Sequence, residues 1–279
     1  MKKTITWILI IVLSLSLFGG CGNAKTTEEA EADVGSTPPS DADFIANLTK
    51  GLESRWELSN SDAYSDTSAM STAEEQKADT LFVNAELDAI GNLDDYQFED
   101  AELKALAETY MKGLNLQKDG IPYRGTNDSA SLEKTWYLGY YYRVICIADF
   151  YHNYGLTVDE KYQQTLEDFV AESTTAKKEI AIQDFVNDLA ATISYTKDEE
   201  SSDEYSSYYT TVIENTTEYE ISTLYIYVDF LDADGVVIYQ GIDSIENFQP
   251  GTKVKSKVFC SNEDGQAETM QYKITAYTN

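Results

Sequence analysis

The sequence predicts an all-α helical bundle followed by a small all-β sandwich. Between residues 41 and 195 apolar side chains recur with the 3.6-residue period of amphipathic helices. After residue 206 the period changes to two, and short runs rich in Thr, Tyr and Val alternate with turn residues. With 42% hydrophobic residues among 279, the chain is large enough to bury a sizeable core.

The N-terminus has the pattern of a lipoprotein export signal. Lys2 and Lys3 form a positive start, an apolar run follows at 7–18, and two glycines precede Cys21. The run is shorter than the ~20 residues that a membrane-spanning helix needs. A Cys after two small residues resembles a lipobox, although Phe18 stands where Leu is usual. We expect a lipid anchor on Cys21; the alternative is an ordinary signal peptide that leaves Cys21 as a free thiol.

The domain boundaries follow changes in composition. Small, acidic and proline residues after the signal predict a disordered tether. An acidic run that starts at Lys197 predicts a solvated linker between the two folded parts. The predicted parts are a signal peptide at 1–20, a tether at 21–40, the helical bundle at 41–195, an acidic linker at 196–206 and the β domain at 207–279.

Capping residues divide the helical part into five or six helices. Ser40 with Asp43 and Ser71 with Glu74 have the spacing of helix starts. Thr157 with Glu160 predicts another capping box, and a break is expected at 174–175. The most apolar helix, at 132–154, is expected to be surrounded by neighbours, and Gly139 would let one of them approach closely.

Alternating apolar residues predict the strands of the β part. Leu224, Ile226, Val228 and Phe230 share one face, and Asp234-Gly235 predicts a hairpin turn. Further turns are expected around 214–217 and at Pro250-Gly251. The strands are predicted at 208–214, 224–230, 236–239, 253–259 and 269–277.

The C-terminal quarter resembles the FxLYD domain of bacterial cell-envelope proteins. The resemblance lies in Val228-Asp229-Phe230-Leu231-Asp232, followed by Asp234-Gly235. Val228 stands at the family's Phe place, Phe230 at the Leu place and Leu231 at the Tyr place, so only Asp232 is identical. The resemblance implies an extracytoplasmic, immunoglobulin-like β module and brings no catalytic residues with it.

Composition and motifs exclude several classes of function. The chain carries 49 Asp and Glu against 20 Lys and Arg, for a net charge of −29, which argues against nucleic acid as a partner. No nucleotide-binding or zinc-hydrolase motif is present. Because the Asp232–Gly235 segment lacks the rest of a calcium loop, a hairpin turn is the better interpretation. We expect no cofactor and no metal site.

A candidate ligand site comprises Trp136, Tyr140 and Arg143 on one helix face. A charge on such a face must be paired or must reach solvent. Arg143 is therefore either a structural partner of an acidic or aromatic residue, or the anchor of an anionic ligand.

The cysteines also leave two alternatives open. Cys146 and Cys260 could form a disulfide in an exported protein, or could be two inert buried thiols. His152 is six residues from Cys146, on a different helix face, so a Cys–His catalytic pair is not expected.

The sequence predicts a non-enzymatic lipoprotein, anchored through Cys21 on the extracytoplasmic face of the cell membrane, that binds an envelope protein partner. The alternatives are capture of a small ligand near Arg143 and a surface hydrolase. Partner binding predicts an exposed apolar patch on one domain, ligand capture a closed aromatic pocket around Arg143, and hydrolysis an open cleft with converging acids.

Overall fold

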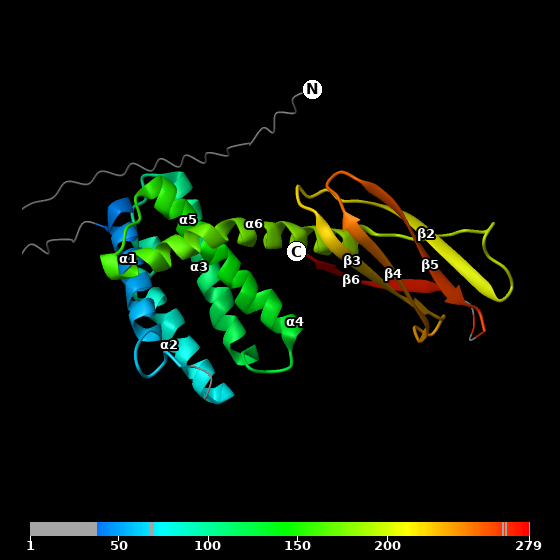
Figure 1. Ribbon diagram of the computed structural model, residues 1–279, viewed down its shortest axis with the longest axis horizontal. Coiled ribbons are helices and arrows are strands. Elements are labelled where there is room, and N and C mark those ends of the chain that lie inside the picture. The colour runs from blue at the N-terminus through cyan, green and yellow to red at the C-terminus, as the bar shows by residue number, and fades with distance from the viewer. Residues whose placement is uncertain (1–37, 67–69, 264, 266, 279) are drawn as a thin grey trace, which may run out of the picture. The chain divides into compact units, whose positions relative to one another are not determined.

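The computed structural model describes residues 38–66, 70–263, 265 and 267–278 (Figure 1). Helices occupy the first part of this range and two small antiparallel β-sheets the last, as the sequence predicts. The predicted signal peptide, Cys21 and most of the predicted tether lie outside the described residues. No helix in the described ranges is long and apolar enough to cross a membrane.

The helices occur in a simple order along the chain. A π-helical segment, η3, joins α4 to α5, so the three form one continuous helical stretch in place of the predicted helix at 132–154. The bounds are α1 Asp41–Ser59, α2 Thr72–Ile90, η1 Leu93–Asp95, α3 Ala101–Gly120, η2 Ile121–Tyr123, α4 Ser129–Leu132, η3 Glu133–Tyr137, α5 Leu138–Tyr154, η4 Glu160–Tyr162 and α6 Gln163–Thr192.

Two of the three predicted capping pairs are confirmed. Ser40 and Asp43 form a reciprocal capping box at α1, and Ser71 and Glu74 form another at α2. The prediction for Thr157 and Glu160 was wrong, because the side chain of Asp159 caps the short η4 turn. That carboxylate accepts the backbone N–H of Lys161 at 3.1 Å and so occupies the capping position itself.

The predicted break at 174–175 was also wrong, since α6 runs through it without interruption for 30 residues. The nearby Ser173 hydroxyl donates to the carbonyl of Val170 at 2.7 Å, within the helix. Ser173 and Ala176 are buried on this part of α6. Tertiary contacts therefore outweigh the weak helix propensity of the Thr pair.

The strands form two three-stranded sheets with the orders β1–β2–β5 and β4–β3–β6, all antiparallel. β4 is much longer than the predicted strand at 236–239, because pairing with β3 continues to Phe248. The bounds are β1 Thr196–Lys197, β2 Ser206–Glu214, β3 Ile221–Leu231, β4 Val237–Phe248, β5 Lys253–Ser261 and β6 Thr269–Tyr277.

The predicted turns of the β part are confirmed. Gly235 has a φ of 77° in the β3–β4 connection, and Gly251 has a φ of 69° between β4 and β5. Both values lie in the left-handed region, which glycine adopts at little cost. The side chain of Asp232 accepts the backbone N–H groups of Asp234 and Val236, each at 2.9 Å, so the acidic residues build a turn.

The segment predicted as an acidic linker is mostly exposed, but it is held to the sheet at its start. β1 pairs with β2 there, and Tyr195 just before it is buried. Asp198 and Asp203 then accept hydrogen bonds from Ser201 and Ser206 and shape the turns that follow. The acidic side chains therefore act locally, as turn-forming residues.

The described residues contain two large hydrophobic cores. The first is formed by the helices, around Phe44, Leu48, Tyr110 and Phe150. The second lies between the two sheets and includes the inward side chains that the alternation in β3 predicted. Helix α6 contributes to both cores: Leu166 to the first, and Ile182, Phe185 and Val186 to the second. Its C-terminal half therefore packs beside β6 and belongs to the same core as residues of both sheets.

Candidate functional site

Five polar side chains meet inside the helical core. Glu86 of α2 is fully buried, and its Oε1 accepts Nη1 of Arg55 at 2.8 Å and Nη2 of Arg143 at 2.5 Å. Its Oε2 accepts the hydroxyl of Tyr110. The side-chain oxygen Oε1 of Gln117 accepts hydrogen bonds from both arginines, at 3.1 Å from Arg143 and 3.3 Å from Arg55. We call these residues the buried ionic cluster.

Burial and neighbouring charges together shift the pKa values of the groups in the buried ionic cluster. Burial alone would raise the pKa of Glu86, but Arg143 and Arg55 together hold that pKa below its usual value. Burial and the charge of Arg143 lower the pKa of Arg55. Burial, followed by Glu86, raises the pKa of Tyr110 well above its usual value, so its phenol keeps the proton that it donates.

Two glycines make room for this cluster. A Cβ on Gly139 of α5 would lie 2.5 Å from the carbonyl oxygen of Gly113 on α3, a distance that real Cβ atoms do not show. A Cβ on Gly113 would lie 3.1 Å from Cγ of Arg143. The close helix approach expected at Gly139 is therefore present, and it brings Arg143 of α5 within reach of Gln117 on α3.

The three predicted ligand residues make separate contacts. Arg143 belongs to the buried ionic cluster, which is the ion-pair alternative that the sequence left open. Trp136 packs beneath the guanidinium of Arg124, 4.7 Å from its ring centre. The hydroxyl of Tyr140 donates to Glu172 at 2.6 Å. None of these residues lines the groove described below.

Cys146 and Cys260 are both free and buried, so they form no disulfide. They lie in different cores, Cys146 among the helices and Cys260 between the sheets. Burial raises the pKa of the Cys146 thiol to about 12, with a further contribution from Asp149. His152 is exposed and its ring contacts Tyr151. The inert-thiol alternative therefore agrees with the structure.

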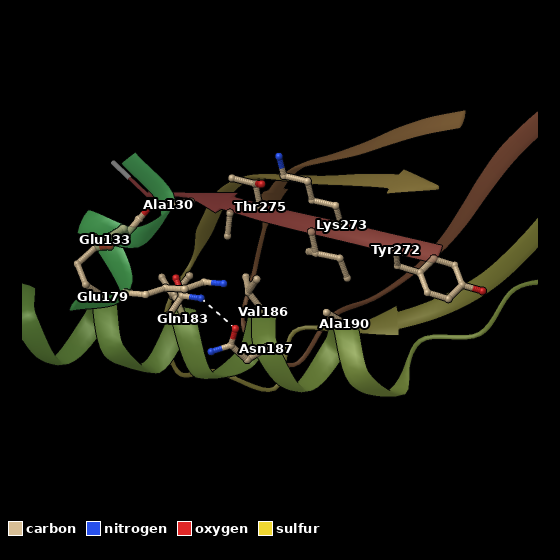
Figure 2. A pocket seen from close by; sticks show the side chains of 14 residues that line it. Ala130, Glu133, Glu179, Gln183, Val186, Asn187, Ala190, Tyr272, Lys273 and Thr275 are labelled. Carbon is tan, nitrogen blue, oxygen red and sulfur yellow. Dashed lines mark hydrogen bonds between the residues drawn. The ribbon is translucent and has the colours of Figure 1, made fainter. Parts of the chain in front are cut away.

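A groove with a volume of about 310 Å³ lies between α6 and β6 (Figure 2). Its α6 side is partly apolar: Val186 and Ala190 face β6, and the polar residues Gln183 and Asn187 line the same side. Figure 2 shows Glu133 and Glu179 at one end, and Tyr272 and Ala190 at the other. The lining residues are Ala130, Glu133, Lys134, Glu179, Ile182, Gln183, Val186, Asn187, Ala190, Tyr272, Lys273, Ile274, Thr275 and Ala276. We call this feature the α6–β6 groove.

One wall of the α6–β6 groove is the edge of a sheet. β6 is an outer strand, and within the described residues it pairs only with β3. Five consecutive residues, 272–276, line the groove. Since side chains alternate between the two faces of a strand, consecutive lining residues show that the strand edge itself faces the groove. Backbone N–H and C=O groups on such an edge are free to bind another extended chain.

Two carboxylates mark one end of the α6–β6 groove. Glu133 and Glu179 also line a smaller hollow of about 30 Å³ beside Tyr141. Burial, then Glu179 and Glu133, raise the pKa of Tyr141, so both carboxylates act on the same ring. The hydroxyl of Thr278 donates to Oε1 of Glu179 at 2.7 Å, which places this end next to the end of β6.

In the described ranges, no group of three or more His, Cys, Asp or Glu side chains is arranged to hold a metal ion. The sequence pattern did not single out Glu86 or Gln117. The signal was available for Glu86, which shares the helical period of Ala78, Val83 and Ile90 and is thus an acid on an apolar face. The α6–β6 groove had no such signal, because it joins residues that lie about 80 or more positions apart.

No family model, curated protein or solved structure matches this chain.

Proposed function

We propose that the chain is a non-enzymatic lipoprotein, anchored through Cys21 on the extracytoplasmic face of the cell membrane, which binds an envelope protein partner. The lipobox-like sequence before Cys21 supports the anchor. The observation that carries the binding proposal is the α6–β6 groove, which combines a partly apolar floor with an edge strand that pairs on one side only among the described residues. Protein partners commonly use such an edge for binding.

The proposal includes an immunoglobulin-like sandwich of the FxLYD type for the β part. Two antiparallel sheets that share one hydrophobic core support it. The hairpin at Asp232–Gly235 supports it as well, because it follows the segment that carries the resemblance. Such modules lack chemistry of their own and present surfaces to partners.

The test uses two alanines that are neighbours on α6. Ala190 and Ala191 are both exposed, but only Ala190 lines the groove. Tagged protein on intact cells is cross-linked to its surroundings as wild type, Ala190→Trp and Ala191→Trp. We expect one stoichiometric partner with wild type and Ala191→Trp, and at least a tenfold loss with Ala190→Trp. Equal recovery with both variants would exclude the groove as the binding site.

The anchor is tested in the same cells with Cys21→Ala. The variant should be released from the membrane fraction into the medium or periplasm, because the net charge of −29 offers no attraction to an anionic bilayer. Full retention of this variant in membranes would contradict the lipid anchor.

A hydrolase is the second candidate, because Glu133 and Glu179 line the same groove. Glycosidases use two carboxylates across a cleft, with one acting as an acid. Hydrolysis of envelope polysaccharide that is lost in both Glu133→Gln and Glu179→Gln would favour this candidate over partner binding. Small-ligand capture at Arg143 has less support, since that side chain is engaged by Glu86 and Gln117.

A further inference from the structure

The edges of the two sheets are not equally accessible. β4 and β5 are edge strands that cover one another: a Cβ on Gly241 would lie 3.0 Å from the carbonyl oxygen of Phe259. Asp243 on β4 accepts the backbone N–H of Lys257 on β5 at 3.3 Å. On the other side, β1 is an edge of only two residues. β6, with nine residues, is therefore the longest edge in the described ranges that no other strand covers, and helix α6 packs beside it.

The sequence of β6 does little to protect this edge. Sheets resist unwanted pairing with prolines, bulges, short edge strands, inward charges, edge lysines and covering helices. Of these, β6 has Lys273 and the neighbouring helix α6. β6 contains neither proline nor glycine, and Lys273 is its one charged residue. β6 pairs with β3 without a register shift over the range Thr269–Tyr277. A regular and long edge of this kind is suited to accept a further strand.

Helix α6 lines the side of the groove opposite the edge of β6. Phe185 turns toward the β core, and Ile182 and Val186 belong to that core and also line the groove. Gln183 and Asn187 face the groove and hydrogen-bond to one another at 3.2 Å (Figure 2). A chain laid beside β6 would contact Val186 and Ala190 with one face. Its other face would lie level with Lys273 and Thr275.

We infer that the α6–β6 groove binds an extended segment of the partner protein as an added strand, antiparallel to β6, with Lys or Arg near the start of that segment. The inference rests on the proposed function and specifies how the partner is held. Antiparallel pairing is the more stable arrangement per residue. It places the start of the bound segment beside the end of β6, where Glu133 and Glu179 lie.

The expected charge preference depends on position. Lys134 and Lys273 also line the groove, so a cation is favoured at the Glu133 and Glu179 end and not along the whole segment. Each partly exposed ion pair contributes modestly, and two together correspond to about 3- to 10-fold in affinity. The strand pairing itself supplies the larger part of the binding, through backbone hydrogen bonds that do not depend on sequence.

The test uses two capped peptides of the same composition and the full soluble chain without its predicted signal and with Cys21→Ser. One peptide is Lys-Lys-Thr-Val-Thr-Val-Thr-Thr, and the other is Thr-Thr-Val-Thr-Val-Thr-Lys-Lys. We expect the first to bind about 3- to 10-fold more tightly by calorimetry. The difference should disappear in the Glu133→Gln/Glu179→Gln variant, while both peptides still bind.

Amide hydrogen exchange identifies the site directly. Bound peptide should slow exchange in residues 272–276 of β6, and Ala190→Trp, but not Ala191→Trp, should abolish the effect. Tighter binding of the second peptide than of the first would overturn the antiparallel arrangement. Absence of binding by both peptides up to 1 mM would overturn strand addition. If the peptides show no preference but Ala190→Trp still loses the cellular partner, this inference fails while the proposed function stands.

Discussion

The helical core and the β core both bury polar side chains, but they bury different kinds. Among the helices, Glu86 and Arg143 are fully buried as ions and meet across α2 and α5. Between the sheets the buried polar residues are neutral. Asn215 donates to the backbone carbonyls of Tyr219 and Phe248 at 2.9 and 2.7 Å, and Tyr195 and Ser256 hydrogen-bond at 2.6 Å.

The difference follows from where backbone hydrogen bonds are made. Within a helix the backbone is satisfied internally, so only side chains can make specific contacts with neighbouring helices. In the β part the turns leave backbone carbonyls without ladder partners, and a neutral amide can satisfy two of them. The ionic cluster therefore determines which helix faces meet, whereas Asn215 determines how the chain turns.

Helix α6 connects the two cores, and cutting it gives the largest expected effect. A fragment of 207–279 lacks Ile182, Phe185, Val186 and Tyr195, each buried in the β core. At about 1.5–3 kcal/mol per buried side chain, the loss is of order 6–12 kcal/mol, as large as the stability of a typical domain. We expect no cooperative urea transition for this fragment.

A fragment of 176–279 is the control, because it keeps the C-terminal half of α6. It should unfold cooperatively when followed by circular dichroism. If 207–279 unfolds with the same midpoint as 176–279, α6 contributes nothing to the β core and the two cores are independent.

The sequence predicted local features well and contacts between distant segments poorly. The capping boxes at Ser40 and Ser71 and the alternation in β3 depend on residues a few positions apart, so their patterns are visible in the chain. The continuity of α6 depends on burial against other elements and overrides the Thr pair at 174–175.

The candidate site was even less predictable. An arginine on an apolar face shows that a partner is needed, but the partner Glu86 lies 57 positions away. The α6–β6 groove exists only because the sheet order leaves β6 at an edge. Strand order is a property of the whole fold, which alternation within single strands does not determine.

Within the helical core, Glu86→Gln should give the largest effect of a single substitution. It leaves the buried Arg143 and the partly buried Arg55 without their counter-ion. Breaking a buried pair typically costs about 3–5 kcal/mol. The free energy of unfolding from urea titration measures the loss. Asp88→Asn, two residues along α2 and exposed, is the matched control and should change it by less than about 0.5 kcal/mol.

The effect of Glu86→Gln should also depend on pH. The pKa of Glu86 is lower in the folded chain than its usual ~4.3, so its contribution is complete above that value and is lost as pH falls. The difference in the free energy of unfolding between wild type and Glu86→Gln should therefore shrink in acid, where wild-type Glu86 takes up a proton. A gap that is constant from pH 7 to pH 3 would show that the carboxylate charge is not what stabilises the cluster.

In the β core, Asn215→Ala should cost less, about 2 kcal/mol. The substitution leaves the carbonyl of Phe248 without its side-chain donor and that of Tyr219 with the Thr217 hydroxyl alone, but it leaves no charge behind. Asn215→Asp separates the two roles of the side chain, because it keeps the acceptor for the N–H of Thr217 and removes both donors. Urea titration should place Asn215→Asp at or below the stability of Asn215→Ala. If Asn215→Asp is as stable as wild type, the donated hydrogen bonds do not hold the turn. If Asn215→Ala costs as much as Glu86→Gln, neutral and ionic burial are equivalent in this chain.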